Sequence, residues 1–399
     1  MATGPADAPS TTRRVNASAG AALPVLVGRD AVSALRRALL PAENRVPDDA
    51  LAAAIGWLVR THDATGRQGS SKGYSLLHGW LPAYPETTGY VLGTLLDFAR
   101  RSGDGVDLRR RAGEMGDWEA AIQEPDGGIM EGAIGTLPRR SIVFNTGMVL
   151  HGWVDLLDEG EQRFAEPAKR AAAFLATGLR DDGTWDPAHE YSGIPHTYNS
   201  RVAWAMVRLA LRESRDEALL AAARRQLDWV VAQQRPNGWF DSCIFKPGML
   251  PSTHGIAYTL RGLLESHALL GEGPYLDAAV KSSEVLIRKL EVLGTLPASW
   301  DDDWTPRASY QCLTGTVQLG GVWLRLHQLT GDARFLNAGL KAIELAASRQ
   351  ERGPWKDVDG ALAGSFPIWG RYAPLQYPNW ATKFLADSLM LRDDCLVSL

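Results

Sequence analysis

The stretch Gln233-Gln234-Arg235-Pro236-Asn237-Gly238-Trp239-Phe240 closes a helical run with turn residues. Two related stretches stand earlier in the chain, Gln123-Glu124-Pro125-Asp126-Gly127-Gly128 and Asp181-Asp182-Gly183-Thr184-Trp185. Each of them joins Asp or Asn to Gly, which is a strong turn signal. The three stretches therefore mark the ends of repeated helical units.

The glycines Gly128, Gly183 and Gly238 are evenly spaced, 55 residues apart. Similar steps of 56 and 59 residues lead on to Gly294 and Gly353, and Gly73 lies 55 residues before the first mark. This period predicts six units of two helices each. A unit of that size cannot bury its apolar face alone, so it has to stack on its neighbours.

A second mark follows each turn, where small or polar residues open a strongly apolar helix. Such residues are typical N-caps, and the helices behind them are apolar enough for burial on most sides. The alternate helices are amphipathic and charged, for example at 222–233 and 333–350, and belong outside. The openings lie at residues 86–90, 145–148, 199–202, 253–256, 314–317 and 379–382.

Six inner and six outer helices in alternation predict an all-α fold, an (α/α)6 toroid of six helical hairpins. We expect residues 46–399 to form this toroid as a single domain and residues 1–45 to form a flexible N-terminal arm. A short helix near Asp30–Leu40 would dock the arm. No period-two apolar pattern indicates a large sheet, and the structural alternative is a helical solenoid that does not close.

Composition narrows the class of protein further. The 399 residues carry 46 acidic and 42 basic side chains, so nothing favours a nucleic-acid partner. No apolar run is long enough for a membrane span, and no secretory signal is recognisable. The three cysteines, Cys243, Cys312 and Cys395, are too few for a disulfide scaffold. We expect a cytoplasmic protein, and nothing indicates its oligomeric state.

Parallel inner helices bring their N-termini together at one mouth of the ring. Each N-terminus carries about half a positive charge, so the mouth favours an anionic group. Glu86 stands there beside Tyr84, either as a carboxylate that the dipole favours or as a catalytic group. Asn145 opens the second inner helix and is a binding candidate. His254, Tyr258 and Arg261 share one helix face, which favours a functional role over a structural one.

Three further segments are rich in candidate site residues. An arginine that heads an apolar helix needs an anion or an internal carboxylate. Crowded carboxylates beside indoles favour a raised pKa and a general acid, Asp301 or Asp303, although a solvated acidic loop is the alternative. Aromatic side chains with Arg and Lys are typical of a wet, aromatic-lined cleft. The candidates for substrate binding in these segments are His196, Tyr198, Asn199, Arg201, Trp300, Trp304, Tyr310, Trp369, Tyr372, Asn379, Trp380 and Lys383.

The Gln-x-x-Asp/Asn-Gly-x-Trp turn at Gln233–Trp239, with its two relatives, resembles the repeats of α/α toroids. The resemblance covers roughly residues 50–391. One group with this shape contains glycoside hydrolases, polysaccharide lyases and sugar epimerases, and the other contains terpenoid cyclases and protein prenyltransferases. The resemblance implies the fold more strongly than the reaction.

The motifs of three enzyme groups with this shape can be compared with single residues of this chain. The acid motif of class II terpenoid cyclases, Asp-x-Asp-Asp, lacks its first Asp here, at Trp300-Asp301-Asp302-Asp303. The sugar 2-epimerases imply a pair of histidines in the mouth, for which His196 and His254 are available. The lanthionine-forming cyclases imply zinc on two cysteines and a histidine. Cys243, Cys312 and His254 map near the mouth, but the Cys-His-Gly signature is absent, so we expect neither a metal nor another cofactor.

These features together predict an enzyme that acts on an acidic, uronate-type glycan by general acid–base hydrolysis, elimination or epimerisation. Arg201 and Arg261 would bind the carboxylate. The stacking surfaces would be Trp300, Trp304, Trp369 and Tyr372, and the proton-transfer groups would be Glu86, His254 and Tyr258. One alternative is a terpenoid-type cyclase that uses Asp303 as its acid. Another is a non-catalytic toroid that binds a glycan or a partner protein.

Overall fold

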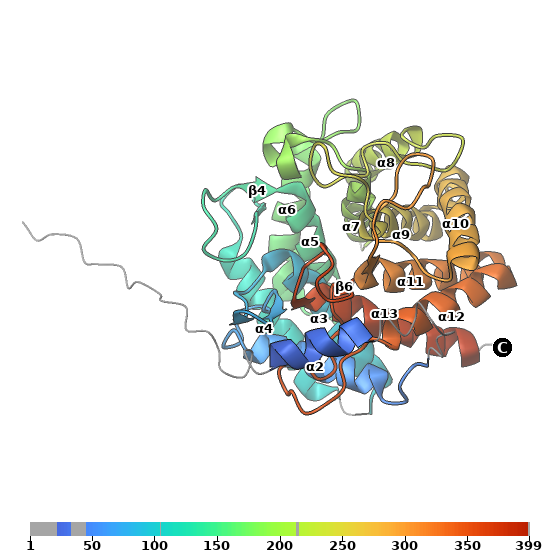
Figure 1. Cartoon of the computed structure of the whole chain (residues 1–399). Helices are drawn as coiled ribbons and strands as arrows, with labels where there is room; N and C mark the ends of the chain where they lie inside the picture. The colour runs from blue at the N-terminus through green and yellow to red at the C-terminus, as the bar shows by residue number, and fades with distance from the viewer. Residues whose placement is uncertain (1–21, 33–44, 104, 213–214, 398–399) are drawn as a thin grey trace, which may run out of the picture.

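The structure is a computed structural model that describes residues 22–32, 45–103, 105–212 and 215–397. Its helices form two concentric layers around one axis (Figure 1). The inner layer consists of α3 (Pro85–Arg101), α5 (Val143–Asp158), α7 (Ser200–Ala210), α9 (Thr253–Leu270), α11 (Leu313–Thr330) and α13 (Asn379–Val397). The outer layer consists of α2 (Ala50–Asp63), α4 (Val106–Ile122), α6 (Ala165–Gly178), α8 (Glu217–Ala232), α10 (Gly273–Leu293) and α12 (Ala333–Ala347).

The ring closes on itself. Each inner helix packs against the next one along the chain, and α13 packs against both α3 and α2. The expected (α/α)6 toroid is therefore confirmed, and the open solenoid is not formed. In the part of the chain described, no helix combines the length and the apolar character that a membrane span needs.

Burial separates the two layers as the apolar pattern predicts. In α5 every residue from Val143 to Val154 is buried, because this helix touches neighbours on all sides. In the outer helix α8 the buried residues include Leu219, Ala223 and Leu227, which recur at helical spacing and form one stripe. The opposite side of α8 remains in solvent.

The repeated glutamine has a structural reason. Gln123, Gln234 and Gln350 stand just after the outer helices α4, α8 and α12, and each side-chain amide donates to a backbone carbonyl of the next outer helix. A buried carbonyl is costly to leave unpaired, so these amides join successive units. The acceptors are Pro167 O at 3.0 Å, Ala278 O at 2.8 Å and Ala50 O at 2.9 Å.

The exact register of the repeat differs from the expected one. The turn glycines with positive φ are Gly127, Gly183 and Gly238, at 88°, 83° and 83°, so Gly128 is one residue late. In the last unit the equivalent turn glycine is Gly360, at 88°, and not Gly353. Gly294 ends α10 in a left-handed cap. The connecting loops differ in length, which is why a constant step lost the register.

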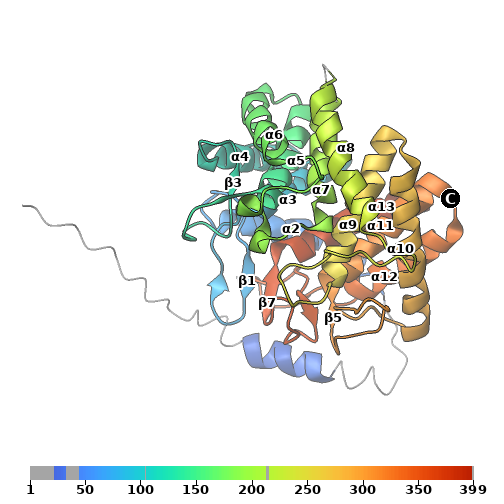
Figure 2. The same ribbon diagram turned by 90° about the horizontal axis from the view of Figure 1, so that it is seen from above.

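Within the described residues, seven short strands gather at the end of the ring where the inner helices begin, as Figure 2 shows for β1, β5 and β7. They form three antiparallel ribbons in the orders β2-β1-β7, β3-β4 and β5-β6, and β1 pairs with β7 to join the first and last units. Their bounds are β1 Gly73–Ser75, β2 Gly79–Trp80, β3 Ile129–Met130, β4 Ser141–Ile142, β5 Gln311–Cys312, β6 Ser365–Phe366 and β7 Gln376–Pro378. Short 3-10 helices lie at η1 Gln162–Phe164, η2 Pro187–His189, η3 Tyr191–Gly193 and η4 Thr197–Asn199.

The N-terminal segment is helical over residues 22–32, which is earlier than the expected helix at Asp30–Leu40. Residues 1–21 and 33–44 lie outside the described residues, so the rest of the expected arm and helix stays untested. Arg29 forms two 2.6 Å hydrogen bonds with Glu351, and Asp30 accepts one of 2.9 Å from the backbone of Ile368. These contacts dock the helix on the loops of the sixth unit, so residues 22–32 are not a loose arm.

Candidate active site

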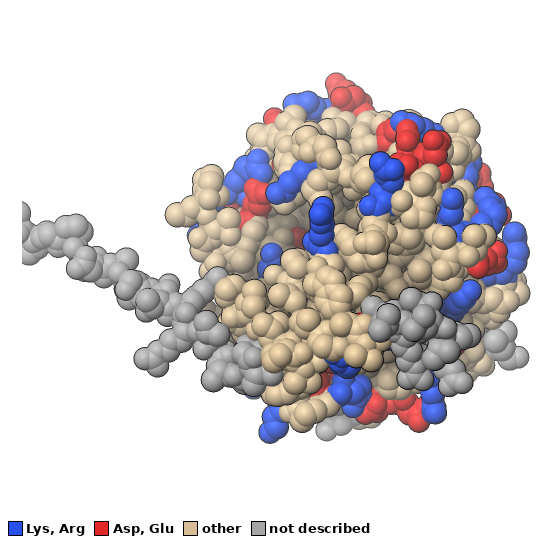
Figure 3. Space-filling model, viewed as in Figure 1, with Lys and Arg blue, Asp and Glu red and all other residues tan. Residues whose placement is uncertain are grey.

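The face of the ring where the inner helices begin is hollowed near its middle (Figure 3). Glu86 lies there in the first turn of α3, directly after Pro85 at the helix start. Its Oε2 accepts a 2.6 Å hydrogen bond from the hydroxyl of Tyr84. Burial raises the pKa of the Glu86 carboxyl, and the hydrogen bond from Tyr84 and the charges of Lys72 and Arg201 oppose that rise. Burial thus makes Glu86 a candidate proton donor, because it favours the neutral acid over the carboxylate.

His254, in the first turn of α9, faces the same region. Its Nδ1 lies 2.5 Å from Oε1 of Gln318, and its ring packs 4.2 Å from that of Tyr258 and 5.4 Å from that of Tyr372. Burial lowers the pKa of His254 to about 3. Because Gln318 accepts the Nδ1 proton, the lone pair is on Nε2, which makes no hydrogen bond with any described residue. The imidazole is therefore a neutral base.

Three aromatic side chains close the ring beneath these two groups, and we call them the aromatic layer. Tyr90, Tyr258 and Phe384 are each the sixth residue of their helices, α3, α9 and α13. The hydroxyls of Tyr90 and Tyr258 are 3.4 Å apart, and the ring of Phe384 lies 5.7 Å from Tyr90 and 5.8 Å from Tyr258. The layer forms the floor of the mouth.

The segment before α7 forms one wall and is held from behind. Tyr198 stacks on His196 with ring centroids 4.5 Å apart. Both ring nitrogens of His196 lie 2.7 Å from backbone carbonyls, those of Ile244 and Tyr191. With both ring nitrogens next to backbone carbonyls, His196 is held in place behind Tyr198, and the histidine pair that the epimerase resemblance implies stays a prediction.

A buried carboxyl that sequence reasoning missed lies behind this wall. Both carboxyl oxygens of Glu190 lie 3.0 Å from Nδ2 of Asn199, and burial raises the pKa of Glu190 to about 8. Glu190 is only 1% exposed, so Asn199 is occupied with an internal partner. The sequence offered no signal for it, because Glu190 lies in a loop without helical period.

Two other asparagines expected to bind substrate also make internal bonds. Asn145 donates to the backbone of Met130 at 2.7 Å. Asn379 donates to Ser71 O at 2.8 Å and Thr87 Oγ1 at 2.8 Å, which ties the last unit to the first. Both asparagines are buried, so in this structure they hold the mouth together.

The sixth unit contributes the aromatic wall that the sequence predicts. Trp380 donates from Nε1 to the hydroxyl of Tyr372 at 2.8 Å, and its ring lies 6.3 Å from that of Tyr84. Trp369 is the most exposed of these side chains, at 45%, and Tyr310 is partly buried. Tyr372 and Trp380 therefore join the Glu86 and His254 region, whereas Trp369 lies at the surface.

The acidic loop stands apart from this cluster. Oδ1 of Asp301 accepts from the backbone of Asp303 and Thr305, so Asp301 organises a turn, and Asp303 is exposed. Trp300 and Trp304 are 0% and 3% exposed, and their indole nitrogens are bonded internally. In this structure the two indoles pack inside the protein, where a sugar could not stack on them, and the loop is the solvated one that was the alternative.

Arg201, Arg261 and Lys383 lie on the other side of the aromatic layer and line a separate cavity. The position of Arg261 follows from helix geometry, because seven residues after His254 place it about 10 Å farther along α9. His254 and Arg261 therefore lie on the same face of α9 but at different distances from the mouth. Of the three basic residues, Arg201 is the one whose charge, together with that of Lys72, opposes the rise in the pKa of Glu86.

The cysteines are engaged in packing. Cys312 Sγ accepts a hydrogen bond from the backbone of Gly315 at the start of α11, and Cys243 lies 3.6 Å from the hydroxyl of Thr259. Burial raises the pKa of Cys243 to about 11 and that of Cys312 to about 12. Both are therefore protonated thiols, and the described residues contain no cluster of three or more His, Cys, Asp or Glu placed to hold a metal ion.

The architecture is shared with solved sugar enzymes. A cellobiose 2-epimerase from Bacillus thermoamylovorans superposes with a TM-score of 0.68 at 12% identity, over 85% of this chain and 96% of that one. The fold is the toroid of these enzymes. An unsaturated glucuronyl hydrolase specific for heparin superposes with a TM-score of 0.67 at 14% identity, over 88% of this chain and 97% of that one. A D-mannose isomerase gives 0.67 at 12% identity, over 90% and 100%. No family model and no curated protein sequence matches the chain.

Proposed function

We propose that this protein converts a sugar by general acid–base catalysis at the mouth of the toroid, with Glu86 as the acid and His254 as the base. The observation that carries the proposal is that Glu86 and His254 both lie in first turns of inner helices at the mouth and are linked through Tyr84, Trp380 and Tyr372. Burial raises the pKa of the carboxyl and keeps the imidazole neutral. Groups with separated proton affinities are what proton removal and proton delivery need.

Epimerisation or isomerisation fits this pair better than hydrolysis does. In an open-chain sugar, His254 would remove the proton from the carbon next to the carbonyl, and Glu86 would protonate the carbonyl oxygen to form the enediol. The protonated imidazole then returns a proton to C1, or to the other face of C2, while the Glu86 carboxylate takes the hydroxyl proton from O2 or from O1. Both groups regain their starting states, and no outside reductant or oxidant is needed. Hydrolysis instead uses two carboxyl groups on either side of the bond, and the expected partner, Asp301 or Asp303, lies in a surface turn.

A uronate-type substrate is the second candidate. The charge of Lys72 favours the ionised form of Glu86, so the mouth has a positive charge available for an acidic sugar, whereas Arg201 acts on Glu86 from across the aromatic layer. The nitrogen of Lys72 lies 5.1 Å from the ring centre of Tyr84, at the edge of the mouth. Elimination or hydrolysis of such a glycan would use the same Glu86. The cyclase alternative has less support, because its acid, Asp303, is exposed.

Proton NMR in D2O tests the proposal directly. Purified protein is incubated with neutral aldoses and ketoses in one panel and with uronate-containing oligosaccharides in another. Deuterium at the carbon next to the carbonyl supports epimerisation or isomerisation, new alkene protons indicate elimination, and new reducing ends indicate hydrolysis. Glu86→Gln and His254→Gln must abolish whichever change occurs. If the wild-type protein leaves every spectrum unchanged, the enzymatic proposal fails, and a glycan-binding toroid remains.

A further inference from the structure

A second cavity of about 920 Å³ opens at the end of the ring opposite to the mouth, and we call it the back chamber. All six inner helices line it, and it reaches their last turns at Arg101, Asp158 and Asp394. Tyr90 and Phe384 of the aromatic layer form its floor. Small residues such as Gly93 and Gly321 are among those that line it. The volume is within the usual range of small-molecule sites.

Charged side chains dominate the walls of the back chamber. Its lining contains seven Lys or Arg and six Asp or Glu. Several of them neutralise one another, as Arg208 does with Asp155 at 2.7 Å. Lys383 pairs in the same way with Asp387. These pairs give the chamber fixed hydrogen-bonding groups without a large net charge.

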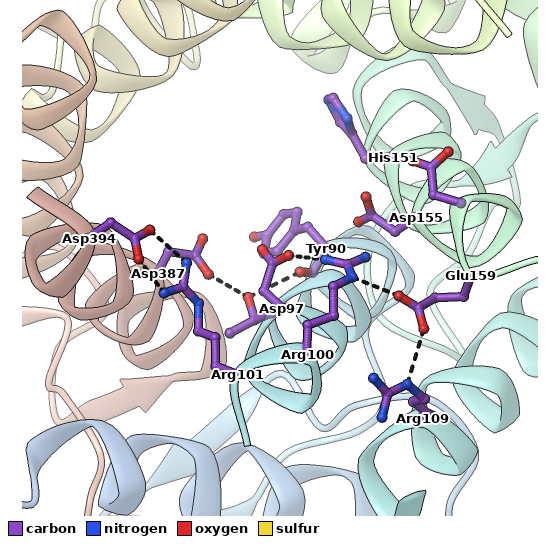
Figure 4. Close-up of polar contacts among 12 residues, drawn as sticks. Tyr90, Asp97, Arg100, Arg101, Arg109, His151, Asp155, Glu159, Asp387 and Asp394 are labelled. Carbon is purple, nitrogen blue, oxygen red and sulfur yellow. Dashed lines mark hydrogen bonds and ion pairs between the residues drawn. The ribbon is translucent and has the colours of Figure 1, made fainter. Parts of the chain in front are cut away.

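Three carboxylates face one another across the chamber. Asp97 of α3, Asp155 of α5 and Asp387 of α13 are arranged around the central opening (Figure 4). Burial and the charges of Asp155 and Asp387 raise the pKa of Asp97 to about 6. Thr94 donates to Asp387 at 2.7 Å. Such a set accepts hydrogen bonds from the hydroxyls of a polyol, and it repels a ligand with many negative charges.

Arg201 is the exception among these charges. Its side chain is only 4% exposed, yet within the described part of the chain it makes no ion pair and no side-chain hydrogen bond, and its Nε is a buried donor without a partner. Its guanidinium lies instead over aromatic rings, 4.8 Å from Tyr258, 5.6 Å from Trp204 and 5.7 Å from Phe384. A buried guanidinium is costly to leave unpaired, and its planar fork matches a carboxylate or a phosphate.

We propose that the back chamber is a second ligand site, which binds a small acidic sugar with its anionic group on Arg201. A carboxylate or phosphate would pair with the guanidinium, and Asp97, Asp155 and Asp387 would accept hydrogen bonds from the hydroxyls. Trp204 provides an apolar face beside them. This site lies deeper along the inner helices than the mouth: Tyr90 and Phe384 of the aromatic layer line its floor, and neither Glu86 nor His254 lines it, although Gln318, the partner of His254, does.

Calorimetric titration with glucose 6-phosphate, glucuronate, inorganic phosphate and neutral glucose tests the site. Wild-type protein is expected to bind glucose 6-phosphate, glucuronate or both, and the sugar that binds shows whether the site prefers a phosphate or a carboxylate. Neutral glucose and inorganic phosphate are expected to bind more weakly. Arg201→Met is expected to weaken the acidic sugar by about tenfold to a hundredfold, as the loss of a charged hydrogen bond does. Arg235→Met, at a surface turn paired with Asp241 and Asp302, is the matched control and leaves binding unchanged.

A location probe keeps the test valid if a variant folds poorly. Wild-type protein labelled with 5-fluorotryptophan is titrated with the acidic sugar, and the ¹⁹F signal of Trp204 is assigned through Trp204→Phe. A shift of that signal, retained in Glu86→Gln, supports the chamber. The proposal is overturned if no acidic sugar binds at millimolar concentration, if Arg201→Met binds as wild type does, or if Glu86→Gln abolishes binding, since the ligand would then occupy the mouth.

Discussion

The hydroxyl of Tyr84 donates a 2.6 Å hydrogen bond to the carboxylate of Glu86, two residues farther along the chain. The two side chains meet because Tyr84 is still extended while Glu86 is already in the first turn of α3. This bond stabilises the ionised carboxylate, whereas burial stabilises the neutral acid. The proton affinity of the proposed acid is therefore set by a contact that a single substitution removes.

We expect Tyr84→Phe to raise the pKa of Glu86. If Glu86 acts in its protonated form, activity falls as pH rises through that pKa, so the falling limb of kcat/KM moves to higher pH in the variant. The measurement is a pH–rate profile. Tyr275→Phe, which removes a similar 2.8 Å bond to Asp228 in an outer helix, is the control. A limb that stays in place, or moves to lower pH, contradicts the assignment.

Glu86→Gln is expected to reduce kcat by about a hundredfold to ten-thousandfold, the usual contribution of general acid–base catalysis, with a small change in KM. The amide keeps the shape of the side chain but cannot deliver the proton. The control is Glu131→Gln, which alters a carboxylate paired with Arg140 in the β3–β4 connection. Steady-state kinetics beside a circular dichroism spectrum separate lost chemistry from lost folding. A variant that retains most of its kcat excludes Glu86 as the acid.

The pH–rate profile is expected to show no limb near pH 6.5 from His254, although 6.5 is the usual pKa of a histidine. Burial lowers its pKa to about 3, so the base loses activity only in strongly acidic solution. Gln318→Leu removes the acceptor at Nδ1 and lowers the pKa further, because the hydrogen bond to Gln318 favours the charged form. Its expected signature is a lower kcat without a limb near neutral pH. A rising limb near pH 6.5 that disappears in His254→Gln would show that this histidine is not buried as described.

Glu190 predicts a dependence of stability on pH. Its pKa is raised from 4.5 to about 8 in the folded protein, so it holds its proton more tightly there than in the unfolded chain. Its contribution is complete below pH 4.5 and is lost as pH rises toward 8. The free energy of unfolding should fall by up to about 1.4 kcal/mol per pH unit in this window relative to Glu190→Gln. Urea unfolding of both proteins across the window measures it, and parallel curves contradict the prediction.

The acidic loop gives a contrast between two neighbouring residues. Asp303→Asn is expected to leave kcat/KM unchanged, because the side chain is in solvent. Trp304→Ala is expected to destabilise the fold by about 3–5 kcal/mol, since the indole is 3% exposed and packs on Trp239 and Trp300. Denaturation midpoints and kinetics on both variants test the contrast. Loss of activity in a well-folded Asp303→Asn protein would instead support the cyclase hypothesis, in which Asp303 is the general acid.

Much of the architecture was predictable because its signals are local. The turn at Gln233–Trp239 ends a helix through its own residues, and the apolar helices that follow can be stable only inside a second layer. Glu86, His254 and Tyr258 could be placed on inner helices for the same reason. What local pattern could not supply is the rotation of each helix about its axis. Nor could it supply the path of the loops: Trp300 lies in the loop between α10 and β5, and whether its indole faces a sugar or the core depends on the packing of neighbours far along the chain.

The sequence by itself determined six helical hairpins and the kinds of polar side chain at the starts of their inner helices, because periodicity and turn chemistry are properties of short segments. Closure of the ring, for which an open solenoid was the alternative, was decided by the packing of α13 on α3 and α2. Only the tertiary structure decided which polar groups meet. It set Glu86 against Tyr84 and His254 against Gln318, 64 residues away. It also separated Arg201 and Arg261 from the mouth by an aromatic layer contributed by three different helices. How deep a side chain lies along the inner helices, and which side chain it meets across the ring, depend on segments far apart in the sequence. These relations therefore arise only when the ring closes.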